Sequence, residues 1–273
     1  MAACERPKYR PTSIPHRDPG RHVLSLVNLK KSFGGIIATD DLSMDFSQGS
    51  LSAIIGPNGA GKTTLFNLIS GRIRPDSGRI VFNNEDIAGL PATQIVHKGI
   101  ARAFQVSSIF PTFTVRQSFE AAVLAKWRKL NNLFTPFSQM ATRERAQELM
   151  EKVGLQHRAC TLSRHLAHGE QKLLDIGLAL ALEPSLLLLD EPTAGMGPEE
   201  RIDMIGRVHA LWEREKITVI FIEHDMDIVF EYAQVIRVLC YGALLAEGTA
   251  EQIRSNQAVI DAYLGAGFTE DAA

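Results

Sequence analysis

The sequence has too few cysteines for a disulfide framework or a zinc site. It contains three in 273 residues, Cys4, Cys160 and Cys240, and none belongs to a Cys-x-x-Cys pair. An odd, scattered set of this kind fits a reducing compartment, where structural disulfides are rare. A chain of this length can bury enough surface to fold without such cross-links.

Long hydrophobic runs are also missing. The most apolar stretches, residues 176–182 and 186–189, end at Glu183 and Asp190. Both are far shorter than the roughly 18 residues that a membrane-spanning helix needs. Residues 1–21 are rich in proline and basic residues but lack the apolar segment of a secretory signal. We expect them to form a disordered arm, with a contact to anionic lipid headgroups or to a partner as the alternative.

The chain also lacks an excess of positive charge. Its 29 Lys and Arg residues against 31 Asp and Glu give a net charge of -2, which argues against a nucleic-acid-binding protein. The 45% hydrophobic and 22% charged residues are typical of a globular protein and exclude general disorder. We expect one ordered unit over residues 22–265, followed by a flexible tail at 266–273.

Sequence patterns divide this unit into three parts. Strands are predicted at 23–33, around the alternating Leu42, Met44 and Phe46, and at 51–55 and 79–82. Thr114 and Gln117 form a capping box for a helix through Trp127, and a second helix is predicted at 142–153 with Gly154 as its C-cap. A loop is expected at 131–139. Residues 93–165 are therefore predicted to be an inserted helical subdomain.

The last part alternates helices and strands, a pattern that predicts a parallel sheet covered on both faces. The helices are expected at 170–182, at 198–215, from Asp225 and after a capping box at Thr249. The strands are expected at 186–189 and 217–222, with a hairpin around Gly242. The fold class is thus α/β, with a mainly parallel core, an antiparallel β subdomain and the helical insertion.

A glycine-rich loop follows the predicted strand 51–55 and precedes a helix predicted at 64–70. It fits the phosphate-binding pattern G-x-x-x-x-G-K-[ST], and it consists of Gly56, Pro57, Asn58, Gly59, Ala60, Gly61, Lys62 and Thr63, with Thr64 beginning the helix. Glycines let backbone N–H groups close around phosphates, and a helix N-terminus favours anions. Lys62 is expected to reach the β- and γ-phosphates, and the Thr63 hydroxyl to bind Mg²⁺.

Three further polar residues follow predicted buried strands. Asp190 and Glu191 end the run at 186–189, and His224 follows the strand at 217–222. Carboxyl ends of parallel strands share one edge of the sheet, so all three are expected beside the phosphate loop. Asp190 is predicted to bind Mg²⁺, Glu191 to polarise the attacking water, and His224 to contact the γ-phosphate or hold the water.

Together these motifs resemble the nucleotide-binding subunit of ATP-binding cassette (ABC) transporters, over residues 23–264. Glu191-Pro-Thr193 continues the family's Asp-Glu-Pro-Thr. The resemblance implies that Gln105 is the family's loop glutamine, which binds nucleotide and metal, and that Phe33 stacks on adenine. It also implies that the signature segment, residues 166–170, contacts nucleotide through Ala167, His168, Gly169 and Glu170. Taken alone, these residues would read as a surface glutamine, a core phenylalanine and a helix N-terminus.

Departures from the family pattern indicate a subfamily. Ala167 replaces the usual serine, His168 replaces a glycine, and Gly197 replaces an aspartate that bridges the dimer. These features, with residues 222–226 and the ending at 262–265, are similar to the ATPases of branched-chain amino-acid importers. Importers of urea and short-chain amides share this group and remain an alternative.

The resemblance implies a peripheral ATPase at the cytoplasmic face of the membrane, with ATP and Mg²⁺ as cofactors. It would pair head to tail with a second ATPase subunit, identical or different, and bind permease subunits through a groove near residues 106–113. A secreted solute-binding protein would be an indirect partner, and nucleic acid is not expected. A lipid-extracting ATPase and a soluble ABC ATPase acting on ribosomes or DNA are the alternatives. The second usually has two cassettes, and a nucleotide-free scaffold would need a broken phosphate loop.

Overall fold

The computed structural model describes residues 22–103, 110–130 and 139–267, and its centre is a six-stranded sheet. The strand order is β10-β9-β3-β8-β7-β6, and all neighbours pair in parallel except β10 with β9. The strands are β3 (Leu51–Ile55), β6 (Ile100–Ala103), β7 (Leu186–Asp190), β8 (Thr218–Ile222), β9 (Val235–Cys240) and β10 (Ala243–Gly248). The mainly parallel α/β core predicted from the alternating pattern is confirmed.

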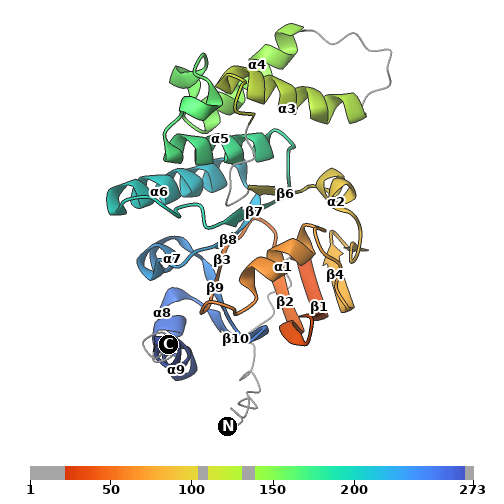
Figure 1. The fold of residues 1–273 in the computed structure, drawn as a ribbon, viewed down its shortest axis with the longest axis vertical. Coiled ribbons are helices and arrows are strands. Elements are labelled where there is room, and N and C mark those ends of the chain that lie inside the picture. Colours follow the sequence, from red (N-terminus) through yellow and green to blue (C-terminus); the bar gives the residue numbers. More distant parts are fainter. Residues whose placement is uncertain (1–21, 104–109, 131–138, 268–273) are drawn as a thin grey trace.

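A second, antiparallel sheet is formed by the first part of the chain. Its order is β2-β1-β4-β5, and its strands are β1 (His22–Phe33), β2 (Ile36–Ser47), β4 (Ser77–Phe82) and β5 (Glu85–Asp86). Leu42, Met44 and Phe46 are buried in β2, as their alternation with polar residues predicted. Because β2 and β10 are in contact, the small sheet lies beside the hairpin edge of the large one (Figure 1).

Helices cover the six-stranded sheet. They are α1 (Lys62–Ile69), α2 (Ala92–Lys98), α5 (His168–Leu180), α6 (Pro198–Glu215), α7 (Met226–Tyr232), α8 (Ala250–Arg254) and α9 (Gln257–Gly267). Alternate residues of β7 enter two different cores: Leu186 and Leu188 pack with α1 and the small sheet, while Leu187 and Leu189 pack with α5 and α6. A strand buried on both faces has to be apolar throughout, which explains its run of four leucines.

A helical group packs beyond α5, at the top of Figure 1. It contains α3 (Val115–Leu130), α4 (Gln139–Lys152) and the short 3-10 helices η1 (Gln156–Arg158) and η2 (Ser163–His165). The capping box at its start is present, because the Thr114 N–H donates to Gln117 Oε1 and the Gln117 N–H donates to Thr114 Oγ1. Ala146, Leu149 and Met150 form the buried face of α4, as their spacing predicted.

Several predicted boundaries move by a few residues. Helices α1 and α5 each begin two residues before the predicted positions 64 and 170, at Lys62 and His168. Strand β6 falls within residues 93–165, the range predicted for the helical subdomain, but it pairs with β7 of the core sheet. The bounds of the helical subdomain therefore stay a prediction: α3 and α4 follow β6, whereas α2 precedes it. Helix α9 continues to Gly267, inside the tail predicted at 266–273.

Two predicted segments lie largely outside the described residues. These are the arm at 1–21 and the loop at 131–139, of which only Gln139 is described, as the first residue of α4. Among the described residues, none of the helices combines the length and the apolar character needed to span a membrane.

Two helical glycines offer a matched test of how tightly the helical group packs on α5. A Cβ atom added at Gly177 would lie 2.5 Å from the ring of Phe119 in α3, whereas one added at Gly206 of α6 would lie 3.9 Å from its nearest neighbour. Alanine favours a helix over glycine at both positions. We expect Gly177→Ala to lower the free energy of unfolding by about 1–3 kcal/mol through overpacking.

Thermal or urea unfolding measures this difference. Gly206→Ala is the control and should leave stability unchanged or raise it by up to about 1 kcal/mol. Equal stability of the two variants would contradict the close packing of α3 on α5.

Candidate active site

The glycine-rich loop between β3 and α1 can be built only with glycine at two of its positions. Gly56 has φ +148 and Gly61 has φ +97. A Cβ at Gly56 would lie 2.1 Å from the carbonyl oxygen of Leu239, and one at Gly61 would lie 2.2 Å from that of Ala38. Glycine is required because the backbone adopts a left-handed conformation and approaches other strands closely. The loop is therefore fixed between the two sheets.

Lys62 occupies the centre of this loop. It is buried, and its Nζ donates hydrogen bonds to the carbonyl oxygens of Gly56 at 2.6 Å and Pro57 at 3.1 Å. Burial lowers the pKa of Lys62, while the charges of Glu191 and Asp190 oppose that shift. The structure thus brings the predicted lysine and both predicted carboxylates into one electrostatic site.

The remaining loop positions surround this lysine. Ala60 is buried, Asn58 and Gly59 are exposed, and Thr63 is exposed in the first turn of α1, followed by Thr64. Tyr263 of α9 also reaches the loop. Its pKa is raised to about 12 by burial, against the effect of a hydrogen bond with the Gly56 backbone. Tyr263 lies in the segment 262–265 that resembles the subfamily, and its sequence pattern predicts no role for it.

Asp190 ends β7 with one oxygen paired and the other free. Its Oδ2 accepts a hydrogen bond from Arg102 Nη2 at 2.5 Å, whereas Oδ1 is buried and has no hydrogen-bond partner. A buried carboxylate oxygen without a donor suits a hard cation, and Mg²⁺ prefers oxygen ligands. The residues present therefore fit Mg²⁺. Gln105, predicted to bind nucleotide and metal, lies outside the described residues.

Glu191 and His224 form a direct pair. His224 Nε2 lies 2.9 Å from Glu191 Oε1, and the Glu191 N–H donates to the carbonyl oxygen of Ile222 at 3.0 Å. The contact follows from the sheet register, because Asp190 is the pairing partner of Ile222 at the ends of β7 and β8. Glu191 has φ +48, an uncommon value for a residue with a side chain and one that is found at functional sites.

Two buried charges beside this pair were given no role in the sequence analysis. Glu223 accepts hydrogen bonds from the N–H and the hydroxyl of Thr193 at 2.9 and 2.8 Å, and burial raises its pKa. Lys172 of α5 lies with its Nζ 3.4 Å from the Glu191 carbonyl oxygen, and burial lowers its pKa. Charged residues within the apolar pattern of a helix, here Lys172 and Asp175, are the signal that could have identified Lys172.

The signature segment forms the start of α5. Ala167 is the N-cap, and its N–H donates to Glu170 Oε2 at 3.1 Å. Partial burial alone would raise the pKa of Glu170, but hydrogen bonds from Arg158 and from the Ala167 N–H lower it overall. His168 Nε2 lies 3.1 Å from the carbonyl oxygen of Ala194, in the loop that follows Glu191. The structure does not place these residues at the phosphate loop of the same chain, so their nucleotide contacts stay a prediction.

Three aromatic side chains predicted to make contacts are exposed. Phe33, at the end of β1, is 46% exposed, with Lys31 Nζ 5.3 Å from the ring centroid. Phe110 and Phe113 are also exposed and stack with ring centroids 5.1 Å apart. The rest of the predicted groove, residues 106–109, lies outside the described residues. Because they are exposed, Phe33 is accessible to an adenine ring, and Phe110 and Phe113 are accessible to a protein partner.

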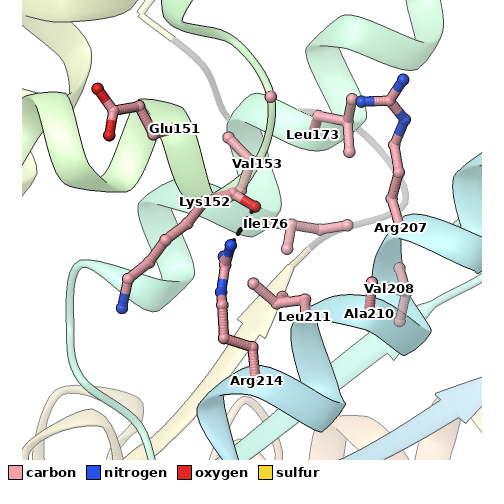
Figure 2. Close-up of a pocket in the computed structure, with 11 residues that line it drawn as sticks. Glu151, Lys152, Val153, Leu173, Ile176, Arg207, Val208, Ala210, Leu211 and Arg214 are labelled. Carbon is pink, nitrogen blue, oxygen red and sulfur yellow. Dashed lines mark hydrogen bonds between the residues drawn. The ribbon is translucent and has the colours of Figure 1, made fainter.

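A cavity of about 210 Å³ lies apart from these residues, between the end of α4 and helices α5 and α6 (Figure 2). Leu173, Ile176 and Leu211 contribute to its apolar lining. The arginines at its edge are already engaged, because Arg207 pairs with Asp203 and Arg214 donates to the Lys152 carbonyl oxygen. None of the predicted site residues lines this cavity.

Comparisons with known proteins agree with this site. A family described as ABC transporter matches residues 39–194, and one described as branched-chain amino acid ATP-binding cassette transporter matches residues 243–269. The chain is 38% identical over 254 residues to the high-affinity branched-chain amino acid transport ATP-binding protein BraF of Pseudomonas aeruginosa, covering 90% of this chain and 98% of BraF. It is 36% identical over 252 residues to LivG of Escherichia coli, covering 89% and 98%.

Solved structures give the same result. A nucleotide-free ATP-binding cassette from an ABC transporter has a TM-score of 0.77 at 30% identity, covering 89% of this chain and 99% of its own. The ADP conformation of MJ1267, an ATP-binding cassette of an ABC transporter, has a TM-score of 0.78 at 31% identity, covering 90% of this chain and 99% of its own. The fold predicted from the motifs is therefore confirmed.

Proposed function

This chain belongs to the ABC transporter family as one of its ATP-binding ATPases, and from that premise we propose that it powers the uptake of branched-chain amino acids. The observation that carries the chemistry is the Glu191–His224 pair at 2.9 Å, beside Lys62 and Asp190. The substrate rests on BraF and LivG, whose names specify branched-chain amino acid transport. Neither of these two relatives is named for urea, amide or lipid transport.

When the phosphate loop binds ATP, Lys62 exchanges its hydrogen-bond partners. Lys62 leaves the carbonyl oxygens of Gly56 and Pro57 and binds the β- and γ-phosphates, which are stronger acceptors because they are charged. The N-terminus of α1 and the loop N–H groups hold the same phosphates. Phe33 stacks on the adenine ring, for which its exposure leaves room.

Glu191 acts as the general base in hydrolysis. It accepts the proton of the water that attacks the γ-phosphate, while His224 fixes the carboxylate and contacts the phosphate. Asp190 and Thr63 would hold Mg²⁺, with Gln105 as a third contact implied by the resemblance. Mg²⁺, when bound, neutralises charge on the phosphates.

A second subunit completes the site. We place the signature residues of the partner subunit, Ala167 to Glu170, against the γ-phosphate, in a head-to-tail dimer that is either homomeric or heteromeric. Phe110 and Phe113 offer an exposed aromatic contact for a permease subunit at the membrane face. A solute-binding protein outside the membrane would deliver the amino acid to that permease.

Dimer formation depends on a small residue at Gly169. A Cβ there would lie 3.0 Å from Glu200 Oε1, a flexible side-chain end that can move aside. We expect Gly169→Trp to prevent ATP-driven dimerisation while the single subunit still binds ATP. Light scattering with ATP, in a Glu191→Gln background that retains the nucleotide, measures this. ATP-dependent dimers of the Gly169→Trp variant would contradict the proposed interface.

Uptake into proteoliposomes tests the transported solute. The chain is reconstituted with the permeases and the binding protein encoded beside it, and labelled leucine, urea and acetamide are supplied in turn. We expect ATP-dependent uptake of leucine alone, lost with Glu191→Gln. ATP-dependent uptake of urea or acetamide without leucine would overturn the assignment of the solute and leave the ATPase assignment standing.

A further inference from the structure

Arg102 is a buried charge that the mechanism above does not use. It lies on the edge strand β6 between Ala101 and Ala103, and its side chain is only 5% exposed. A buried charge is costly unless partners compensate it. The burial of Arg102 therefore has to be compensated by its hydrogen-bond and charge partners.

The partners of Arg102 come from two parts of the active site. Its Nη1 donates to Asn67 Oδ1 at 2.8 Å and to Ser70 Oγ at 3.3 Å, at the end of the helix that begins with Lys62. Its Nη2 donates to Asp190 Oδ2 at 2.5 Å, and the Asp190 side chain is 2% exposed. The guanidinium thus joins α1 to the end of β7 through a fully buried ion pair.

Lys62 is a second cation near Asp190. The charge of Asp190 acts on Lys62, yet the ammonium donates its hydrogen bonds to the neutral carbonyls of Gly56 and Pro57. Neutral acceptors are exchanged for phosphate at a lower cost than a buried carboxylate would be, because charge-assisted hydrogen bonds are the stronger ones. Arg102 pairs with the Asp190 carboxylate, and Lys62 bonds to backbone carbonyls. Lys62 therefore stays available to bind phosphate.

We propose that Arg102 is a positioning residue that neutralises Asp190 in the nucleotide-free protein and thereby reserves Lys62 for phosphate. The inference rests on the proposed function, because it requires the loop to bind ATP. Without Arg102, Asp190 draws Lys62 into an ion pair that the incoming phosphates have to break.

Metal-free ATP binding isolates this effect from catalysis. Titration calorimetry with ATP in EDTA is carried out on wild type, Arg102→Met, Asp190→Asn and the double variant. We expect Arg102→Met to weaken ATP binding by about tenfold or more, since it leaves a buried carboxylate without its partner. The double variant should return to within about threefold of wild type, because the charge that captures Lys62 is gone. Arg102→Lys, which keeps the positive charge, should stay closer to wild type than Arg102→Met.

Arg237 provides the matched control. It is a second buried arginine, on β9, and it donates to the Asp45 carbonyl oxygen and to Glu247 rather than to Asp190. Arg237→Met should lower the free energy of unfolding. Any loss of ATP affinity that it causes should not be restored by adding Asp190→Asn. A double variant as weak as Arg102→Met would overturn the proposal and leave Arg102 a purely structural residue.

If Arg102→Met does not fold, the solubility and ATP binding of the double variant test the proposal instead. A soluble, ATP-binding double variant would then support the proposal, and an insoluble one would overturn it. Wild-type protein that binds no ATP, with or without Mg²⁺, would instead overturn the proposed function.

Discussion

Glu191→Gln is expected to retain ATP binding and to lower hydrolysis by about 10²–10⁴, the range for a positioned general base. Glutamine keeps the size and one oxygen of the side chain, so His224 Nε2 can still find a partner where it now lies 2.9 Å from Glu191 Oε1. The variant loses only the capacity to take a proton from water. Nucleotide titration and steady-state phosphate release on one preparation measure both quantities.

His224→Ala is the companion variant. It leaves the carboxylate in place but removes the group that fixes it, so we expect the same pattern with an equal or smaller loss of turnover. If Glu191→Gln lost binding and hydrolysis together, Glu191 would organise the metal or the loop rather than act as the base. If it kept most of its turnover, the proton would have to pass to His224 or to the phosphate itself.

Lys62→Ala should weaken ATP binding strongly and abolish turnover. The variant removes the buried ammonium that can exchange two carbonyl partners for phosphate oxygens. It also removes positive charge beside Glu191, whose own negative charge then disfavours the nucleotide more strongly. Equilibrium binding of ATP, followed by phosphate release at saturating nucleotide, separates the two effects.

Lys216→Ala is the control for loss of a lysine. Lys216 is exposed and is the C-cap of α6, where it adopts φ +54, and it belongs to none of the predicted site motifs. It should bind and hydrolyse ATP as wild type does. Near-normal hydrolysis by folded Lys62→Ala would contradict the role of the phosphate loop.

The sequence predicted the features that follow from local chemistry. A run of four leucines ending in Asp190 required a strand buried on both faces, and the glycine pattern required the loop that places Lys62. Pro198 marked the start of α6, and that prediction matches both ends of the helix. Such signals are local because they depend on backbone geometry and hydrophobic period.

Features that depend on distant contacts could not be predicted in the same way. Arg102 and Asp190 are 88 positions apart, and nothing in either segment specifies the other as its partner. Strand β6 is only four residues long, too short to show a period, and its place at the edge of the sheet is known only from its pairing with β7. Glu223 likewise reads as a charged residue after a strand until its bonds to Thr193 are seen.

The contact between His168 and Ala194 acquires a meaning in the proposed dimer. In a head-to-tail arrangement, the signature of one chain serves the ATP bound by its partner, while Glu191 of the same chain serves its own ATP. His168 Nε2 lies 3.1 Å from the carbonyl oxygen three residues beyond Glu191, so in the proposed dimer this contact would lie between the two nucleotides that one chain serves. Occupancy at one nucleotide would then be felt at the other within each subunit, and the two hydrolysis events would not be independent.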